Sequence, residues 1–494
     1  MRYSDPSSSN RPRLALFLGA LSLAFLQLAA ALPSPSPAHA RLVRRADVSG
    51  LDDGSRLNQS QVDGVEALLN KTADKSWEIG THLQALLEFH YPSYSPFSSS
   101  SAWANPSSVS GAEKPTQVLT AVASILAAKP ANQLQLVQDG SAADPASIGP
   151  FVALAYALTD GNSSTIVEGS GVTKAQAGEA LQGQLRALTE GTPRSQSGAI
   201  SHRVEDVELW SDFVYMVPPF LSSLSLLSSP PNSTLLQLAY DQIRLYRDAL
   251  RDPSSGLWTH IWVEEGQGNG GDADGGVWAT GNGWAASGML RVLASIQNSG
   301  NSDVVDEFAS QRADLAGWVR EIVEGAWGMP LSNGLLHNYL NSTSTFADAA
   351  STALLISATY RLATLASRFP SALNSSAPSA ESLAAAESAY LTLTSASHSH
   401  ISTSGVLMPV VNPMSYGNQL ANVKADGSGA VSPEGEAFVL LMESARRDFV
   451  EGGGLVSANA SEVRQSSGAA GAGVGGWGRW AVLAVVVVAG AAVV

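Results

Sequence analysis

Residues 233–251 read STLLQLAYDQIRLYRDALR, and their apolar side chains follow a helical period. Leu236, Ala239, Ile243, Tyr246 and Leu250 are separated by steps of three, four, three and four. This spacing places them on one face of an α-helix. The same pattern predicts helices at 61–70, 77–90, 113–129, 146–158, 173–189, 209–227, 233–251, 278–296, 303–324, 346–368, 380–396 and 433–446. Alternating strand patterns are nearly absent, so the sequence predicts an all-α chain.

These helices form one predicted domain, residues 50–452. A dozen helices in consecutive antiparallel pairs can close into an (α/α)6 toroid, although a long two-domain bundle would have the same periodicity. Several connections are long, and long loops on a rigid scaffold tend to carry function. The informative loops are 191–208, 252–277, 327–345 and 404–432.

The N-terminus has the pattern of a secretory signal. Residues 14–32 carry no charge, follow three arginines, and precede a Pro-rich break and a small-residue exit at 38–40. This order predicts a signal peptide over residues 1–40. A cut after the dibasic pair ending at Arg45 would also remove a short propeptide. A signal anchor is the alternative, but the Pro-rich break would end its helix.

The C-terminus resembles a lipid-attachment signal. Residues 480–494 are apolar to the last residue and as a helix would reach about 22 Å, short of a bilayer core of roughly 30 Å. Small residues around Ser467 precede them, within the Gly- and Ser-rich spacer 453–479. This pattern predicts a GPI anchor with its attachment site near Ser467. A short tail anchor is the alternative.

Composition agrees with passage through the secretory pathway to the cell surface or cell wall. Sequons for N-glycosylation occur at Asn58, Asn70, Asn162, Asn232, Asn341, Asn374 and Asn459. The chain has no cysteine, which excludes disulfides and thiolate metal sites. The net charge of −15 argues against nucleic-acid binding. No pattern requires a metal or an organic cofactor, and nothing fixes the oligomeric state.

The segment richest in chemical groups is GTPRSQSGAISHRVEDVELWSDFVYMVPPFL, residues 191–221. It contains His202, Trp210, Asp212 and Tyr215. Asp212 lies within an apolar run, where burial would raise its pKa and suit it to act as a general acid. The alternative is a helix N-cap, in which Ser211 or Asp212 accepts hydrogen bonds from free backbone N–H groups.

Other candidates lie at helix starts and in aromatic loops. Asp144 precedes Pro145 in DPASIGPFVALAYAL, where simple helix capping is the alternative to a catalytic role. Tryptophans beside glycines offer flat faces to sugar rings, although core packing is the alternative for any one of them. The residues of these aromatic loops are Trp258, His260, Trp278, Asn282 and Trp284.

These segments resemble the unsaturated glycuronyl hydrolases, specifically the unsaturated rhamnogalacturonyl hydrolases of glycoside hydrolase family 105, related to family 88. PRSQSGAISHRVEDVELWSDFVYMVPPFL is similar to the family's Trp-x-Asp segment, GLWTHIW to its Gly-Leu-Trp-x-His-x-Trp, and VWATGNGWAASG to its Trp-x-Arg-Gly-Asn-x-Trp. FADAASTALL and PEGEAFVLL resemble its later motifs more loosely. The matches span residues 191–446 in family order.

The resemblance implies an (α/α)6 barrel with the site at one mouth, and an oligosaccharide substrate. It implies that a carboxylic acid protonates the C4=C5 bond of an unsaturated uronide, after which water adds. The family's general acid corresponds to Asp212, and its second aspartate to Asp144. Substrate contacts are then expected from His202, Arg203, Trp210, Tyr215, Trp258, His260, Trp278, Asn282 and Trp284.

The chain also departs from the family pattern. The family's arginine, a natural partner for a uronate carboxylate, is Thr280 here, and Arg203 is expected to take over part of its role. Asp348 stands for a family glutamate, and Glu434 and Glu436 stand where glycines would be. Two alternatives therefore stay open: another glycosidase or transglycosidase on the same toroid, or a catalytically inactive surface glycan-binding protein.

Overall fold

A computed structural model of the chain describes residues 57–98, 109, 111–138, 140–264, 273–395, 397–398 and 400–452. The predicted signal peptide, spacer, lipid anchor and Asn459 lie outside these residues. Within the described part of the chain, no helix combines the length and the apolar character that crossing a membrane requires.

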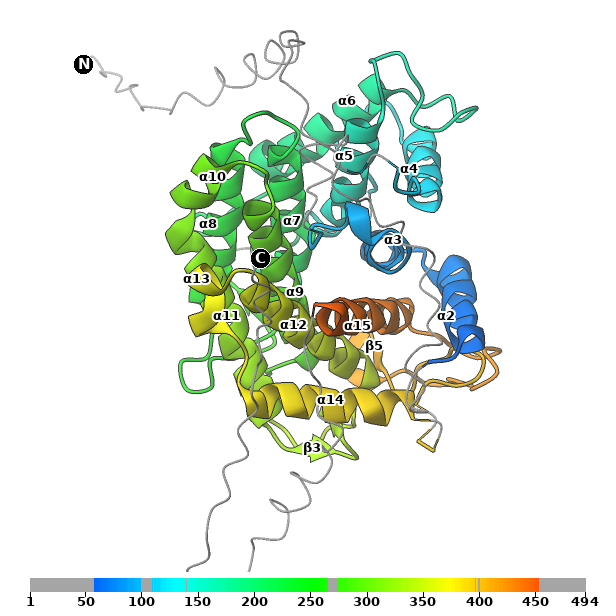
Figure 1. The fold of residues 1–494 in the computed structure, drawn as a ribbon, viewed down its shortest axis with the longest axis vertical. Coiled ribbons are helices and arrows are strands. Elements are labelled where there is room, and N and C mark those ends of the chain that lie inside the picture. Colours follow the sequence, from blue (N-terminus) through cyan, green and yellow to red (C-terminus); the bar gives the residue numbers. More distant parts are fainter. Residues whose placement is uncertain are drawn as a thin grey trace, which may run out of the picture. The chain divides into compact units, whose positions relative to one another are not determined.

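The described chain is a succession of helices (Figure 1). They are α2 (Gln59–Thr72), α3 (Ser76–His90), α4 (Thr116–Ala128), α5 (Gly149–Leu158), α6 (Lys174–Arg186), α7 (Phe213–Ser225), α8 (Ser233–Leu250), α9 (Ala279–Gln297), α10 (Ser302–Glu307), α11 (Ala309–Gly328), α12 (Ala349–Arg368), α13 (Pro370–Leu373), α14 (Ala380–Thr394) and α15 (Pro433–Glu451). Short helical turns are η2 (Pro92–Tyr94), η4 (Asp144–Ile148), η5 (Ala187–Gly191) and η6 (Asn374–Ser376).

Three short antiparallel strand pairs lie in the connections. They are β1 (Glu208–Trp210) with β2 (Ile261–Val263), β3 (Leu331–Ser332) with β4 (Leu335–Leu336), and β5 (Val411–Asn412) with β6 (Ser415–Gln419). The predicted helix 209–227 is corrected at its start, because 208–210 pairs with 261–263 and α7 begins only at Phe213. The predicted helix 303–324 is interrupted at Phe308, where α10 ends and α11 begins.

The inner helices close into a ring. In order, α3 contacts η4 and the α5 that follows it, η4 and α5 contact α7, and α7 contacts α9. The ring continues through α12 to α15, and α15 packs against α3. Each inner helix follows an outer one along the chain, from α2 before α3 to α14 before α15. This closed arrangement confirms the predicted (α/α)6 toroid.

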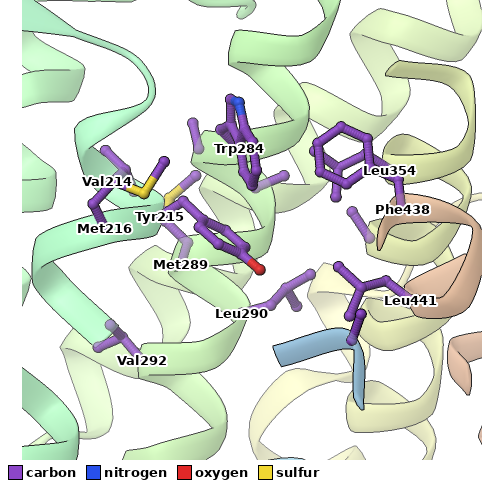
Figure 2. Packing of buried hydrophobic residues seen from close by; sticks show 14 of the residues in the cluster. Val214, Tyr215, Met216, Trp284, Met289, Leu290, Val292, Leu354, Phe438 and Leu441 are labelled. Atoms are coloured by element: carbon purple, nitrogen blue, oxygen red, sulfur yellow. The ribbon is translucent and has the colours of Figure 1, made fainter. Parts of the chain in front are cut away.

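Sequence explains why the inner helices pack so closely. Residues 349–366 of α12 are all buried, and many of them are small. A Cβ at Gly288 of α9 would lie 2.0 Å from the carbonyl oxygen of Val214 on α7, so only glycine permits this approach. Figure 2 shows Tyr215, Trp284 and Phe438 meeting from α7, α9 and α15. The ring centroids of Tyr215 and Trp284 are 4.4 Å apart, and those of Trp284 and Phe438 are 4.8 Å apart.

Candidate active site

Three carboxyl groups meet where inner helices begin. Asp144 opens η4, Asp212 immediately precedes α7, and Glu434 lies in the first turn of α15. The charges of Asp144 and Asp212 both act on Glu434, which shows that the three groups face a common region. The beginnings of these helices therefore form one mouth of the toroid, and this mouth is the candidate active site.

The antiparallel pairing of β1 with β2 brings His260 beside Asp212. Trp210 pairs with Ile261, and the backbone N–H of Ser211 donates to the carbonyl oxygen of His260 at 2.9 Å. As a result Nε2 of His260 lies 3.5 Å from Oδ2 of Asp212, a charge contact rather than a close hydrogen bond. Asp212 makes no side-chain cap for α7, so the capping alternative is not seen.

The opposite edge of the His260 ring faces a second carboxylate. Residues 260–261 form backbone hydrogen bonds with 274–276, which places Oδ2 of Asp274 3.0 Å from Nδ1 of His260. Asp274 also accepts from the Tyr339 hydroxyl at 2.6 Å and from the backbone N–H of Gly276 at 2.9 Å. A Cβ at Gly276 would lie 2.3 Å from the Tyr339 ring, so glycine lets that ring approach.

This Asp212–His260–Asp274 arrangement favours the charged form of each member. Burial alone would lower the pKa of His260, but its interactions with Asp212 and Asp274 outweigh burial and raise it. Burial alone would raise the pKa of Asp212, yet His260 and the charge of His202 lower it below its ordinary value. The expectation that burial would raise the pKa of Asp212 is therefore wrong, because two imidazoles lie beside it.

Asp144 is paired in a similar way. It is 7% exposed, and its Oδ1 lies 3.3 Å from Nε2 of His202. The His202 ring stacks on Trp210 with centroids 4.9 Å apart and planes 9° from parallel. The indole N–H of Trp210 in turn donates to Glu208 at 2.7 Å, which fixes the indole over the imidazole.

Aromatic side chains surround His260. The rings of Trp278 and Tyr416 have centroids 4.4 Å and 4.5 Å from that of His260, and Trp210 contacts it edge-on at 5.5 Å. Trp210 and Tyr416 stay partly exposed, whereas Trp278 is 3% exposed. Partly exposed aromatic faces beside carboxylates suit the binding of a sugar ring.

Four of the predicted substrate contacts lie deeper in the fold. Tyr215 and Trp284 are each 1% exposed and belong to the core shown in Figure 2. Trp258 is fully buried, and Asn282 accepts from its backbone N–H at 2.8 Å and donates to its carbonyl oxygen at 2.9 Å. The structure therefore places these four residues where they hold the site loops and the core, not where a substrate would touch them.

The two residues considered for uronate recognition differ in position. Thr280 lies in the first turn of α9, is fully buried, and has no hydrogen-bond partner for its hydroxyl among the described residues. Arg203 is partly exposed, and its guanidinium lies 3.8 Å from the position a Cβ would take at Gly140. Arg203 thus reaches toward the loop before Asp144.

Sequence reasoning missed several residues of this site. The sequence places Asp274 in a Gly-rich loop with no motif that marks it. Glu434 stands at the start of a predicted helix, at a position where the family has glycine. Tyr339, Tyr416 and Trp77 had no motif to mark them. In the described residues, no group of three or more His, Asp or Glu side chains is placed to hold a metal ion.

The closed ring of paired helices is the architecture of the six-hairpin glycosidases, and its mouth holds the three carboxyl groups. Residues 172–366 match the model of Glycosyl Hydrolase Family 88, a segment that runs from before α6 into α12. This match confirms the predicted resemblance to family 88 over these residues, and the chain is a glycoside hydrolase.

Solved structures agree on the fold. A possible member of glycoside hydrolase family 105 from Salmonella enterica is 16% identical, with 84% of this chain and 99% of that one covered at a TM-score of 0.55. A second possible member, from Klebsiella pneumoniae, is 17% identical, and the match covers 85% of this chain and 100% of that one at a TM-score of 0.55. A family 105 glycoside hydrolase from C. acetobutylicum is 12% identical, and the match covers 79% of this chain and 99% of that one at a TM-score of 0.52. No curated protein sequence matches the chain.

Proposed function

We propose that the protein releases unsaturated uronic acids from the ends of oligosaccharides by adding water to their C4=C5 bond. The observation that carries the proposal is the position of Asp212 at the head of α7, with His260 and His202 beside it and Asp144 in the same mouth. The family 88 match covers the segment that contains Asp212. These observations favour this reaction over a glycan-binding protein without catalysis.

The chemistry needs a proton for C4 and a water molecule for C5. Protonation of the vinyl ether carbon gives an oxocarbenium-like centre, to which water adds with loss of a proton. The resulting hemiketal opens and releases the attached sugar. Asp212 is charged in the resting site, which suits it to accept the proton of the attacking water. Asp144 and the aromatic faces of Trp210 and Tyr416 would orient the substrate.

The test is the ultraviolet absorbance of the conjugated enol-uronate. We expect the full chain, expressed in a eukaryotic host, to remove this absorbance from lyase-digested pectin fragments. Asp212→Asn should abolish the change, because the amide cannot take the proton of water. If the full chain consumes no unsaturated uronide, double-bond hydration is refuted, and standard hydrolysis of neutral wall glycans becomes the reaction to examine.

We also propose that the protein is a glycosylated, GPI-anchored protein of the cell surface. In support, Asn58, Asn70, Asn162, Asn341 and Asn374 are exposed. Asn232 is partly exposed and uses only its amide oxygen to cap α8, which leaves its nitrogen available. Release from intact cells by a phosphatidylinositol-specific phospholipase, and a mass decrease on enzymatic deglycosylation, are the expected results. Retention on the cells after the phospholipase would refute the anchor.

A further inference from the structure

Glu434 is a buried carboxyl group that departs from the family pattern and lies in the candidate active site. It occupies the first turn of α15 and is 4% exposed. The indole N–H of Trp77 on α3 donates to its Oε1 at 2.5 Å. Trp77 makes the one side-chain hydrogen bond that Glu434 has within the described residues, so its second oxygen, Oε2, is not held there. One oxygen is thus fixed and the other is free to meet a ligand.

The charges around Glu434 differ from those around Asp212. Asp212 has two imidazoles beside it, and Asp144 has one. The charged groups that act on Glu434 are the carboxylates of Glu78, Asp212 and Asp144, contributed by α3, the residue before α7, and η4. A buried carboxyl group among carboxylates retains its proton, because a further negative charge would be both desolvated and repelled.

Glu78 is less suited to hold that proton: burial raises its pKa too, but backbone donors oppose the rise. Its carboxylate accepts hydrogen bonds from the backbone N–H groups of Asp74 and Lys75, both at 3.0 Å. Such backbone donors favour the charged form. Glu434 has only the Trp77 indole and the start of α15 to favour its charge. Burial, then the charge of Glu78, outweigh these effects and raise the pKa of Glu434 well above its ordinary value.

We propose that Glu434 holds the proton of the active site and donates it to the substrate, while Asp212 accepts the proton of water. The geometry that supports this is the buried position of Glu434 in the first turn of α15, where Trp77 holds one oxygen and the two aspartates stand at the starts of other inner elements. Two carboxyl groups whose surroundings favour opposite protonation states divide the acid and base roles in this way. Glu434 then takes the role of general acid that the resemblance implied for Asp212, and Asp212 acts as the base.

Atoms and charges balance in this scheme. Oε2 of Glu434 gives its proton to C4, and the π electrons of the C4=C5 bond form the new C4–H bond. The oxygen of water bonds to C5 while one of its protons passes to Asp212. Glu434 ends as a carboxylate and Asp212 as an acid, and a proton returns from Asp212 to Glu434 through solvent. No oxidant, reductant or further reactant is needed.

The inference rests on the proposed function, and Glu434→Gln tests it. The amide keeps the size of the side chain and can still accept from Trp77, but it cannot donate a proton to carbon. We expect kcat on unsaturated uronides to fall by about 10²- to 10⁴-fold, the usual contribution of a general acid, with KM little changed. The alkaline limb of the wild-type pH profile should also disappear.

Glu436→Gln is the matched control on the same helix. Glu436 is fully buried, and burial raises its pKa to about 8. Its Oε1 accepts from the backbone N–H of Leu407 at 2.9 Å, and neither Asp144 nor Asp212 is among the groups that act on it. This variant loses a buried protonated acid as Glu434→Gln does, yet its activity and pH profile should match the wild type.

A direct measurement separates this inference from the proposed reaction. Isotope-edited infrared spectra at neutral pH should show the carbonyl stretch of a protonated carboxylic acid in the wild type, and Glu434→Gln should remove one such component. If the wild type consumes no unsaturated uronide but this component is found, the reaction is wrong and the protonated state of Glu434 is supported. Absence of the component, or full kcat in Glu434→Gln, overturns the inference.

Discussion

Replacing Asp274 with asparagine tests whether His260 must be an imidazolium between two carboxylates. The change keeps the shape of the side chain that contacts Nδ1 of His260 at 3.0 Å and removes its charge. A hydrogen bond to a charged group contributes about 1.5–3 kcal/mol. If that contribution reaches the transition state through His260 and Asp212, kcat/KM at neutral pH falls by about 10- to 150-fold.

The pH dependence gives the sign of the effect. With one carboxylate lost, His260 binds its proton less tightly and supports the charge of Asp212 less. In the wild type His260 lowers the pKa of Asp212, so in Asp274→Asn the pKa of Asp212 should rise. Because Asp212 must be charged to accept the proton of water, the acidic limb of the kcat/KM profile should move to higher pH.

The free energy of unfolding should also depend on pH through His260. The pKa of His260 is raised in the folded state, so its stabilisation is complete below the ordinary value of 6.5 and is lost as pH rises through the folded pKa. In Asp274→Asn the folded pKa of His260 is lower, so this stabilisation should be smaller and its loss should be complete at lower pH. The measurements are pH–rate profiles and urea unfolding at several pH values.

The matched control is Asp252→Asn, in a loop outside the site. Asp252 accepts hydrogen bonds from Ser254 and Ser255 and contacts no catalytic candidate. Its kcat/KM and acidic limb should equal those of the wild type. An Asp274→Asn enzyme with an unchanged acidic limb and less than a threefold loss in kcat/KM would show that His260 does not couple the two aspartates.

Two further predictions concern the ring itself. Arg361 is 3% exposed and pairs with Glu88 at 2.6 Å and with Asp448. Arg361→Met should cost about 3–5 kcal/mol in urea unfolding, because the buried Glu88 loses its cationic partner and the partly exposed Asp448 keeps only Arg447. A smaller deficit at acidic pH, where those carboxylates take up protons, should accompany it; a pH-independent deficit would contradict the reasoning. Gly288→Ala should cost about 1–3 kcal/mol, since its Cβ would lie 2.0 Å from the Val214 carbonyl oxygen; an unchanged unfolding midpoint would show that α7 and α9 separate freely.

The helices were predictable because each has an apolar face of constant period. The predicted segment 233–251 matches α8, and 278–296 differs from α9 by one residue at each end. The start of α7 was not predictable in this way, because residues 208–210 pair with a strand some fifty positions later. Local periodicity carries no information about such a partner, and the same limit applies to the closure of the ring.

The site was predictable where a motif marked it and not where only the fold brought residues together. Asp212, His202 and His260 lie in family-like motifs, and the structure places them in one mouth. Asp274 comes from the end of a Gly-rich loop that has no helical or strand period. The pKa of Asp212 was predicted in the wrong direction because the sequence indicates burial but not which charges lie beside the buried group.

Recognition of a uronate without the family arginine follows from the same charges. Thr280 is fully buried and uncharged, so it cannot attract a carboxylate. His260 has its pKa raised by two aspartates and lies among the aromatic rings of the mouth. The starts of α7 and α15 add the partial positive charge of helix N-termini. A protonated Glu434 adds no repulsion and can donate a hydrogen bond. His260 lies between two carboxylates that offset its charge, so its role is to keep Asp212 charged, and turnover should fall as His260 loses its proton.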